Sequence, residues 1–360
     1  MDALAVVRRR LYDQRLAADP FERPRDAVRW LGAVQAQEFA EAKWSIGQRV
    51  RDCSDADVEQ AFARGEILRT HVLRPTWHFA AADDIRWMLN LTAPRVHAVN
   101  RYWYAKHDLD ESVLARGHEV LSRALDGGEP LTRKELADAL ARAGIAAEGP
   151  RLAYLVMHAE LEALVCSGPR RGAQHTYLLL EDRAPQAPEV TRDQALAELT
   201  RRYFRSHGPA TVKDFTWWSG LTAADARAGL EAVGHELMRE VDDGGTSWIS
   251  APAPAPRCPL DAAGAFLLPG YDEAVIAYKD LKIVLADSPP REGLLARPIV
   301  LDGRTVGSWK RTTTKRAAVI GATLFTSLNA AETQALQAAV QRFGRFLELP
   351  ATLEIDDGRS

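Results

Sequence analysis

The chain has 360 residues, more than a single hydrophobic core usually serves, so we expect two to four domains. Its 46 Lys and Arg nearly balance 49 Asp and Glu, for a net charge of -3, so any contact with nucleic acid must come from a local basic face. The three cysteines are far apart, which argues against a paired-cysteine zinc site and against a disulfide framework. We expect neither a signal peptide nor a membrane span, and hence a soluble, cytoplasmic protein.

Residues 1–110 predict helices followed by a strand hairpin. Apolar residues recur at helical spacing over 24–34, with Pro24 near the helix start, where a missing N–H costs little. An acidic helix over 55–63 stops at a glycine, and residues 67–79 are typical of two strands around a turn. Helices followed by a hairpin are the pattern of a winged helix.

Two further blocks, 111–188 and 189–250, repeat this order of helices and hairpin. In the first of them, a helix over 151–164 leads into a hairpin whose predicted tip is 168–172. In the second, the hairpin turns around residues 242–245. We therefore predict three tandem winged-helix domains.

A run of alternating Ala and Pro at 251–256 predicts a stiff linker, and the predicted secondary structure changes after it. Residues 258–360 contain short apolar strands, among them one at 282–285, and a single helix over 330–346. Asp-Gly at 302–303 is a strong hairpin signal. We predict a small C-terminal β-barrel, and an α+β fold class for the whole chain.

Two neutral amides, Gln35 and Gln37, flank Ala36 where the first predicted helix ends. A carboxamide cannot take a proton from water at neutral pH, but it can position a water molecule and direct a carbonyl oxygen at positive charge. On an α-helix, side chains two apart point about 200° from each other, whereas in an extended segment they share a face. A joint site therefore requires residues 35–37 to leave helical geometry or to end the helix. The alternative is that both are polar residues that cap a helix end.

Fragments throughout the chain carry a family resemblance. They occur in the order 35–37, 74–79, 207–211 with 217–221, 267–273 and 298–304. Together they resemble the bacterial winged-helix DNA-binding-domain family that includes the azinomycin-resistance DNA glycosylase, which unhooks interstrand crosslinks. The resemblance covers nearly the whole chain and is to the Gln-X-Gln branch, whereas another branch has Asp for the second Gln. Ala36 is smaller than the apolar residue that this motif often carries.

The resemblance implies a DNA glycosylase in which Gln35 and Gln37 are the catalytic residues. Because amides are weak catalysts, they suit a base that leaves readily, such as a purine made cationic by alkylation at N7 or N3. We predict excision of alkylated purines from double-stranded DNA by water attack at C1′, with crosslinks as further substrates. Only Lys43 lies near the motif, which predicts a monofunctional enzyme without Schiff-base strand cleavage. We expect a nucleoid-associated monomer with no cofactor and no metal.

Basic side chains suited to DNA lie in three predicted hairpins. The first choice is the hairpin at 310–316, where four cations surround three threonines, because hydroxyl and cation donors suit phosphate oxygens. The next candidate is the tip of the predicted second wing, and the predicted first wing is the weakest of the three. The candidate DNA-binding residues are Lys310, Arg311, Lys315, Arg316, Arg170, Arg171, Arg69, Arg74 and His78. The alternative for each hairpin is a solvated turn, and for His78 it is a core or hydrogen-bonding histidine.

Other conspicuous motifs favour structural roles. Tyr-Asp-Glu at 271–273 has two acids but no His or third carboxylate in register, so we predict a corner that binds backbone amides rather than a metal or acid–base site. We predict that the aromatic residues at 102–104, at 217–218 and at Trp44 pack in cores and between domains.

Two other functions are compatible with the same domains. A transcriptional regulator, or another non-catalytic DNA-binding protein, would insert a recognition helix into the major groove, usually as a symmetric dimer. Three unlike winged helices and no evident dimerisation helix weaken that reading. A scaffold that uses winged helices for protein contacts would have no concave basic face.

Overall fold

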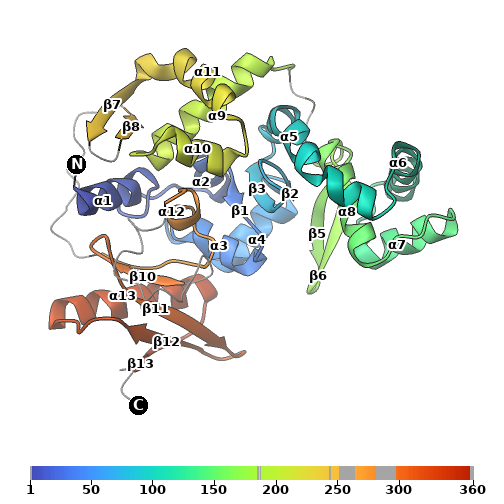
Figure 1. Cartoon of the computed structure of the whole chain (residues 1–360). Coiled ribbons are helices and arrows are strands. Elements are labelled where there is room, and N and C mark those ends of the chain that lie inside the picture. The colour runs from blue at the N-terminus through green and yellow to red at the C-terminus, as the bar shows by residue number, and fades with distance from the viewer. Residues whose placement is uncertain are drawn as a thin grey trace.

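The computed structural model has an α+β fold with four separate sheets in its described residues. The structure describes residues 2–184, 186, 188–242, 245–250, 264–280 and 297–356. In Figure 1 the first block lies at the centre, the third block above it, the C-terminal sheet below it and the second block to the right. No helix in the described ranges is long and apolar enough to cross a membrane.

The first block holds a three-stranded sheet in the order β1-β3-β2. Helix α2 ends at Leu31, short of the predicted end at residue 34, because Gly32 adopts a φ of 83° that breaks the helix. Val34 belongs to strand β1 instead. The elements are α1 (Ala3–Asp13), α2 (Pro24–Leu31), β1 (Val34–Gln35), α3 (Phe39–Gly47), α4 (Asp55–Ala63), β2 (Ile67–His71), β3 (Trp77–Ala81) and α5 (Ile85–Lys106).

The second block has a sheet in the order β4-β6-β5 and a hydrophobic core of its own, in which Leu121, Leu140 and Leu155 are fully buried. The predicted wing tip at 168–172 is mostly strand, because β5 continues through a bulge to Arg171. The elements are α6 (Glu111–Leu125), β4 (Leu131–Thr132), α7 (Arg133–Arg142), α8 (Gly149–Leu161), β5 (Val165–Arg171) and β6 (Gln174–Leu179).

The third block consists of helices followed by a hairpin, the order expected from the sequence. Thr191, Thr211 and Thr222 each begin a helix with a capping box. Residues 243–244 of the predicted turn and the predicted linker at 251–256 lie outside the described residues. The elements are α9 (Arg192–His207), α10 (Val212–Ser219), α11 (Ala223–Val233), the 3-10 helix η1 (Gly234–Glu236), β7 (Leu237–Asp242) and β8 (Gly245–Ser250).

The described C-terminal strands form an open sheet rather than the predicted closed barrel. Their order is β13-β12-β11-β10-β9, and no pair closes β9 onto β13 within the described residues. Because β12 and β13 are parallel, the chain needs a crossover, and α13 supplies it while packing against the sheet. The predicted strand at 282–285 lies outside the described residues. The elements are β9 (Ala265–Leu267), α12 (Glu273–Ile276), β10 (Pro298–Leu301), β11 (Arg304–Thr313), β12 (Ala318–Leu324), α13 (Ala330–Leu347) and β13 (Ala351–Asp356).

Two hydrophobic cores join blocks that are distant in sequence. One core packs the first block against the C-terminal sheet, where the Trp44 ring lies 4.9 Å from that of Phe343 and 5.0 Å from that of Phe346. Another core packs the first block against the third, with Met88 and Trp218 among its fully buried members. The first, third and C-terminal blocks therefore pack together, and the domain limits inferred from the sequence stay predictions.

The aromatic residues expected inside the protein divide into buried and exposed groups. Trp44 and Trp218 are buried as predicted. Trp103 and Trp217 are each 38% exposed but contact other blocks, since the Trp103 ring stacks 5.8 Å from that of Tyr154 and Trp217 Nε1 donates to the Ile276 carbonyl at 3.1 Å. For Tyr102, which is 65% exposed, the prediction is wrong. Successive residues on a helix point about 100° apart, so the neighbour of a buried Trp218 turns toward solvent.

Candidate active site

The Gln-Ala-Gln motif lies in an extended segment between a strand and a helix. Gln35 is the last residue of β1, and α3 begins at Phe39. Between them, the Ala36 N–H donates to the Trp77 carbonyl at 2.7 Å, which extends the pairing with β3. Residues 35–37 are thus outside any helix, which meets the requirement for a joint site.

The two amides differ in their surroundings. Gln35 is 8% exposed, and its Oε1 accepts a hydrogen bond from an Arg74 NH2 group at 2.8 Å. Its backbone N–H donates to Glu273 Oε1 at 2.9 Å. Gln37 is exposed and has no side-chain partner among the described residues. One amide is therefore anchored and oriented, and the other is presented to solvent.

Glu273 holds the motif from the C-terminal part of the chain. Its side chain is fully buried, with one oxygen on Gln35 and the other accepting from Trp218 Nε1 at 2.9 Å. Its backbone carbonyl accepts from Gln14 Nε2 at 3.2 Å. Both carboxylate oxygens are satisfied, so this buried charge fixes the backbone at Gln35.

Asp272, beside Glu273, is held by a buried ion pair. Arg49 donates to its two oxygens at 2.8 and 3.0 Å, Ser45 donates at 2.7 Å and the Ala274 N–H at 2.9 Å. Burial works to raise the pKa of this carboxyl, but Arg49 and the hydrogen bonds outweigh it and hold the pKa below its usual value. The prediction that residues 271–273 form a corner that binds backbone amides is confirmed by the bonds to Ala274 and Gln35.

Two arginines of the β2–β3 hairpin contact the motif from inside the protein. Arg69 is 4% exposed, donates through Nε to the Ala36 carbonyl at 3.0 Å and lies 4.3 Å from the Trp77 ring. Burial lowers the pKa of Arg69 to about 10 and also lowers the pKa of Arg74, whose second NH group donates to the Trp217 carbonyl at 3.2 Å. Both were predicted to contact DNA, and the structure gives both partners within the protein.

His78 is fully buried. Its Nδ1 lies 2.9 Å from the Thr76 carbonyl, and its Nε2 has no hydrogen-bond partner in the described part of the chain. Burial lowers the pKa of His78 well below its ordinary value, so the ring is neutral at pH 7. The structure therefore gives His78 the core position that was the alternative reading, and a contact with DNA would require the hairpin to open.

The arginines of the β5–β6 hairpin, the predicted second wing, are paired with acids. Arg170 donates to both oxygens of Glu59 at 2.8 and 2.9 Å, across to the first block. Arg171 donates to Glu135 at 2.8 Å and to the Pro130 carbonyl at 2.6 Å. These carboxylates neutralise much of the positive charge of Arg170 and Arg171, which were predicted to bind DNA. The Arg170–Glu59 pair also links the second block to the first.

The cationic hairpin at 310–316 joins β11 to β12. Thr313 pairs with Ala318, so the residues between them form its turn. Three of its cations are exposed, whereas the Arg311 guanidinium lies 5.7 Å from the Phe343 ring and its burial lowers the pKa. The exposed cations are Lys310, Lys315 and Arg316. This hairpin presents the unpaired positive charge that the second wing lacks.

The supporting contacts of Gln35 could not be read from the sequence. Glu273 lies 238 residues from it, and Arg74 lies 39 residues away. The only signal was the conspicuous pair of acids at 272–273. Among the described residues, one group of metal-ligating side chains comes together, formed by His97, His158 and Glu162 at the contact of α5 with α8, and it does not include the motif.

The chain is similar to known DNA glycosylases over most of its length. A model of the family described as DNA glycosylase AlkZ-like matches residues 28–346, a range that includes the Gln-Ala-Gln motif and the cationic hairpin. The solved structure of the Streptomyces sahachiroi DNA glycosylase AlkZ superimposes with a TM-score of 0.76 at 22% identity, over 98% of this chain and 100% of that chain. That similarity shows a shared fold. No curated protein sequence matches the chain.

Proposed function

This chain belongs to the AlkZ-like DNA glycosylase family, and we propose that it excises N7- or N3-alkylated purines from double-stranded DNA through Gln35 and Gln37. One observation carries the proposal. The motif is held in an extended segment in which Gln35 is buried and bonded at both backbone and side chain, while Gln37 faces solvent. This is the arrangement of an anchored and a substrate-facing amide.

The division of roles follows from the hydrogen bonds. The Arg74 guanidinium occupies one acceptor site of Gln35 Oε1, so Gln35 is the oriented member of the pair. Gln37 has its carbonyl and amide groups free for a water molecule and for the sugar. An oriented dipole near a developing oxocarbenium ion stabilises the transition state without any proton transfer by the enzyme.

The reaction balances without a basic residue. An alkylated purine carries positive charge, so the C1′–N bond breaks with its electron pair moving to the base, and the base leaves neutral. Water then adds to C1′ and its proton passes to bulk solvent, because an amide does not accept it. Lys43, the nearest lysine in sequence, is 3% exposed and bonded to Asp55 and Glu59, which supports a monofunctional enzyme.

The surface supports a grip on duplex DNA by one copy of the chain. The β11–β12 hairpin offers Lys310, Lys315 and Arg316 to phosphates, and the exposed position of Gln37 leaves room for a bulky base. We extend the proposal to purines that carry large adducts, including interstrand crosslinks.

The test uses a duplex with a single N7-methylguanine, scored for abasic sites. Gln37→Ala is expected to lower the single-turnover rate about 10²- to 10³-fold, the usual effect of removing one transition-state-stabilising group. Gln35→Ala is expected to lower it similarly. Gln60→Ala, an exposed glutamine on α4, is the matched control and should leave the rate unchanged.

Two results would count against the mechanism. Base release that persists unchanged in both motif variants would remove the two glutamines from it. No release from any alkylated duplex, together with tight binding to undamaged DNA, would instead favour a non-catalytic DNA-binding protein or transcriptional regulator.

A further inference from the structure

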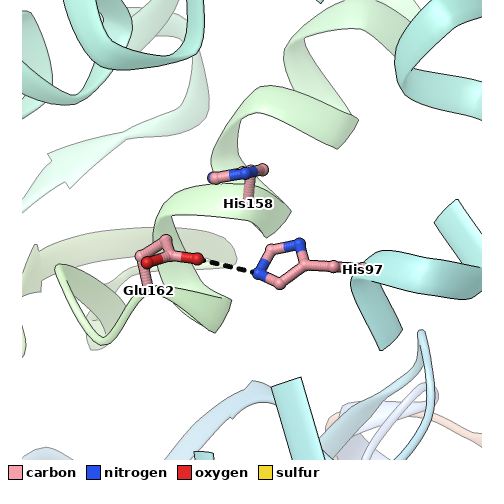
Figure 2. Close-up of side chains that lie close together, drawn as sticks. All are labelled: His97, His158 and Glu162. Carbon is pink, nitrogen blue, oxygen red and sulfur yellow. Dashed lines mark ion pairs between the residues drawn. The ribbon is translucent and has the colours of Figure 1, made fainter. Parts of the chain in front are cut away.

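Two histidines and a glutamate meet where α5 contacts α8. His97 belongs to α5, whereas His158 lies on α8 and Glu162 directly follows its last residue. His158 and Glu162 are four residues apart, so they share one face of the helix. The ligand atoms of the three side chains all lie within 4.8 Å of one another. Figure 2 shows the three side chains converging from the two helices.

The ring nitrogens are arranged as metal ligands with outer partners. His97 Nε2 lies 2.9 Å from Glu162 Oε1 without being aligned to it as a hydrogen-bond donor, and His97 Nδ1 lies 3.0 Å from the Tyr104 hydroxyl. His158 Nδ1 lies 3.1 Å from His118 Nε2, which leaves His158 Nε2 for an ion. A metal-bound histidine commonly has its other ring nitrogen hydrogen-bonded in this way.

The surroundings give an ion both imidazole ligands and access. The three histidines His97, His118 and His158 lie in contact, with the ring centroids of His97 and His118 at 4.5 and 5.0 Å from that of His158. Glu162 is 50% exposed and free to adjust. A cavity of about 700 Å³, lined in part by His97 and His158, opens beside the group. A fourth coordination position would therefore face water.

We propose that His97, His158 and Glu162 bind a divalent transition-metal ion of the zinc class. Two imidazoles and one carboxylate are a donor set for Zn²⁺ or Co²⁺, whereas Mg²⁺ and Ca²⁺ take oxygen ligands. Tetrahedral ligation at zinc distances puts ligand atoms about 3.3 Å apart. Because the ligand atoms already lie within 4.8 Å of one another, no pair needs to approach by more than about 1.5 Å.

The ion would link two blocks of the protein. α5 is the last helix of the first block, and α8 belongs to the second. The Arg170–Glu59 pair joins the two blocks at another place, between β5 and α4. At the α5–α8 contact itself there is a small apolar cluster of Ala93, Val96, Met157 and Leu161. A bound ion adds three bonds to that contact and leaves one position open to the cavity.

The test is a Co²⁺ titration of the full-length protein after removal of metal with a chelator. We expect one Co²⁺ per chain, with the visible absorption of a tetrahedral nitrogen and oxygen site, and its displacement by one equivalent of Zn²⁺. Zn²⁺ should also raise the thermal unfolding midpoint over that in chelator. A wild-type protein that binds no stoichiometric Co²⁺ or Zn²⁺ overturns the proposal.

Variants locate the ion. His158→Ala and Glu162→Gln are each expected to weaken Zn²⁺ binding by at least 10-fold, and Glu162→Gln keeps the shape of a half-exposed side chain, so it should fold even where the histidine variant does not. Tyr104→Phe, which removes an outer partner, should weaken binding about 10-fold. His235→Ala, with a side chain 75% exposed, is the control and should bind normally. Unchanged affinity in Glu162→Gln, or loss in His235→Ala, would place the ion elsewhere.

Discussion

Gln35 and Gln37 have the same side chain, and their environments give them different capacities. The carbonyl oxygen of Gln35 is charge-assisted by Arg74 and its backbone is fixed by Glu273, so its torsional freedom is low. Gln37 keeps all its hydrogen-bonding groups for solvent or substrate. In the proposed mechanism, the side chains of Arg74 and Glu273 contribute by orienting Gln35.

A double-mutant cycle tests the link between Arg74 and Gln35. Arg74→Met retains volume but removes the donor to Gln35 Oε1, so we expect single-turnover excision to fall about 10-fold, equal to ~1.4 kcal/mol of transition-state stabilisation. Combined with Gln35→Ala, it should add little further loss, because both changes remove one interaction. Arg123→Met, at a side chain 77% exposed on α6, is the control. Fully additive losses would show that Arg74 acts independently of Gln35.

Among the structural elements, the two predicted basic hairpins have opposite characters. The second wing carries Arg170 and Arg171, each bonded to a carboxylate, whereas the β11–β12 hairpin carries cations that are exposed. A cation already paired with an acid gains less from a phosphate, because the acid is left without its partner. The hairpin of β11 and β12 is therefore the element that we expect to set DNA affinity.

Salt dependence checks that expectation. Lys315→Ala and Arg316→Ala should each weaken binding to duplex DNA and reduce the slope of log K against log salt by up to about 0.9, the amount for one lost phosphate contact. Lys134→Ala, at a side chain 82% exposed on α7, should change neither quantity appreciably. Fluorescence anisotropy over a salt series measures both. An unaltered slope in both hairpin variants would assign the DNA to another face.

The whole molecule is organised by which blocks share a core. The first block packs against both the third block and the C-terminal sheet, while most buried leucines of the second block form a separate core and Leu180 joins the core of the first and third blocks. The Gln motif lies where the first block meets Glu273 from the C-terminal part, so the site depends on packing between blocks rather than within one.

Hydrogen exchange tests this division. Phe346→Ala removes a fully packed ring from the core that it shares with Trp44, at an expected cost of about 3–5 kcal/mol. Amides of α3 should then lose protection together with those of β11, while amides of α7 keep theirs. Leu140→Ala, in the core of the second block, should give the reverse pattern. Uniform loss of protection in both variants would indicate a single cooperative unit.

Local patterns predicted most of the elements and few of their contacts. The order of helices and hairpins and the Asp-Gly turn at 302–303, whose φ values are 51° and 83°, came from short windows of sequence. The described C-terminal strands form no closed barrel, because strand content by itself does not specify closure. The burial of Arg69 was not predicted, since residue type does not report depth, whereas a core position was the stated alternative for His78.

The sequence by itself determined the family, through an order of fragments, and supplied the proposed pair of catalytic amides, which cannot act as bases. Only the tertiary structure decided that Gln35 is anchored and Gln37 exposed, and that His97 meets His158 and Glu162. The physical reason is the distance along the sequence between interacting residues. Caps, turns and periodicity are set by neighbours a few residues apart, whereas a hydrogen bond across 238 residues exists only once hydrophobic packing has brought its two ends together.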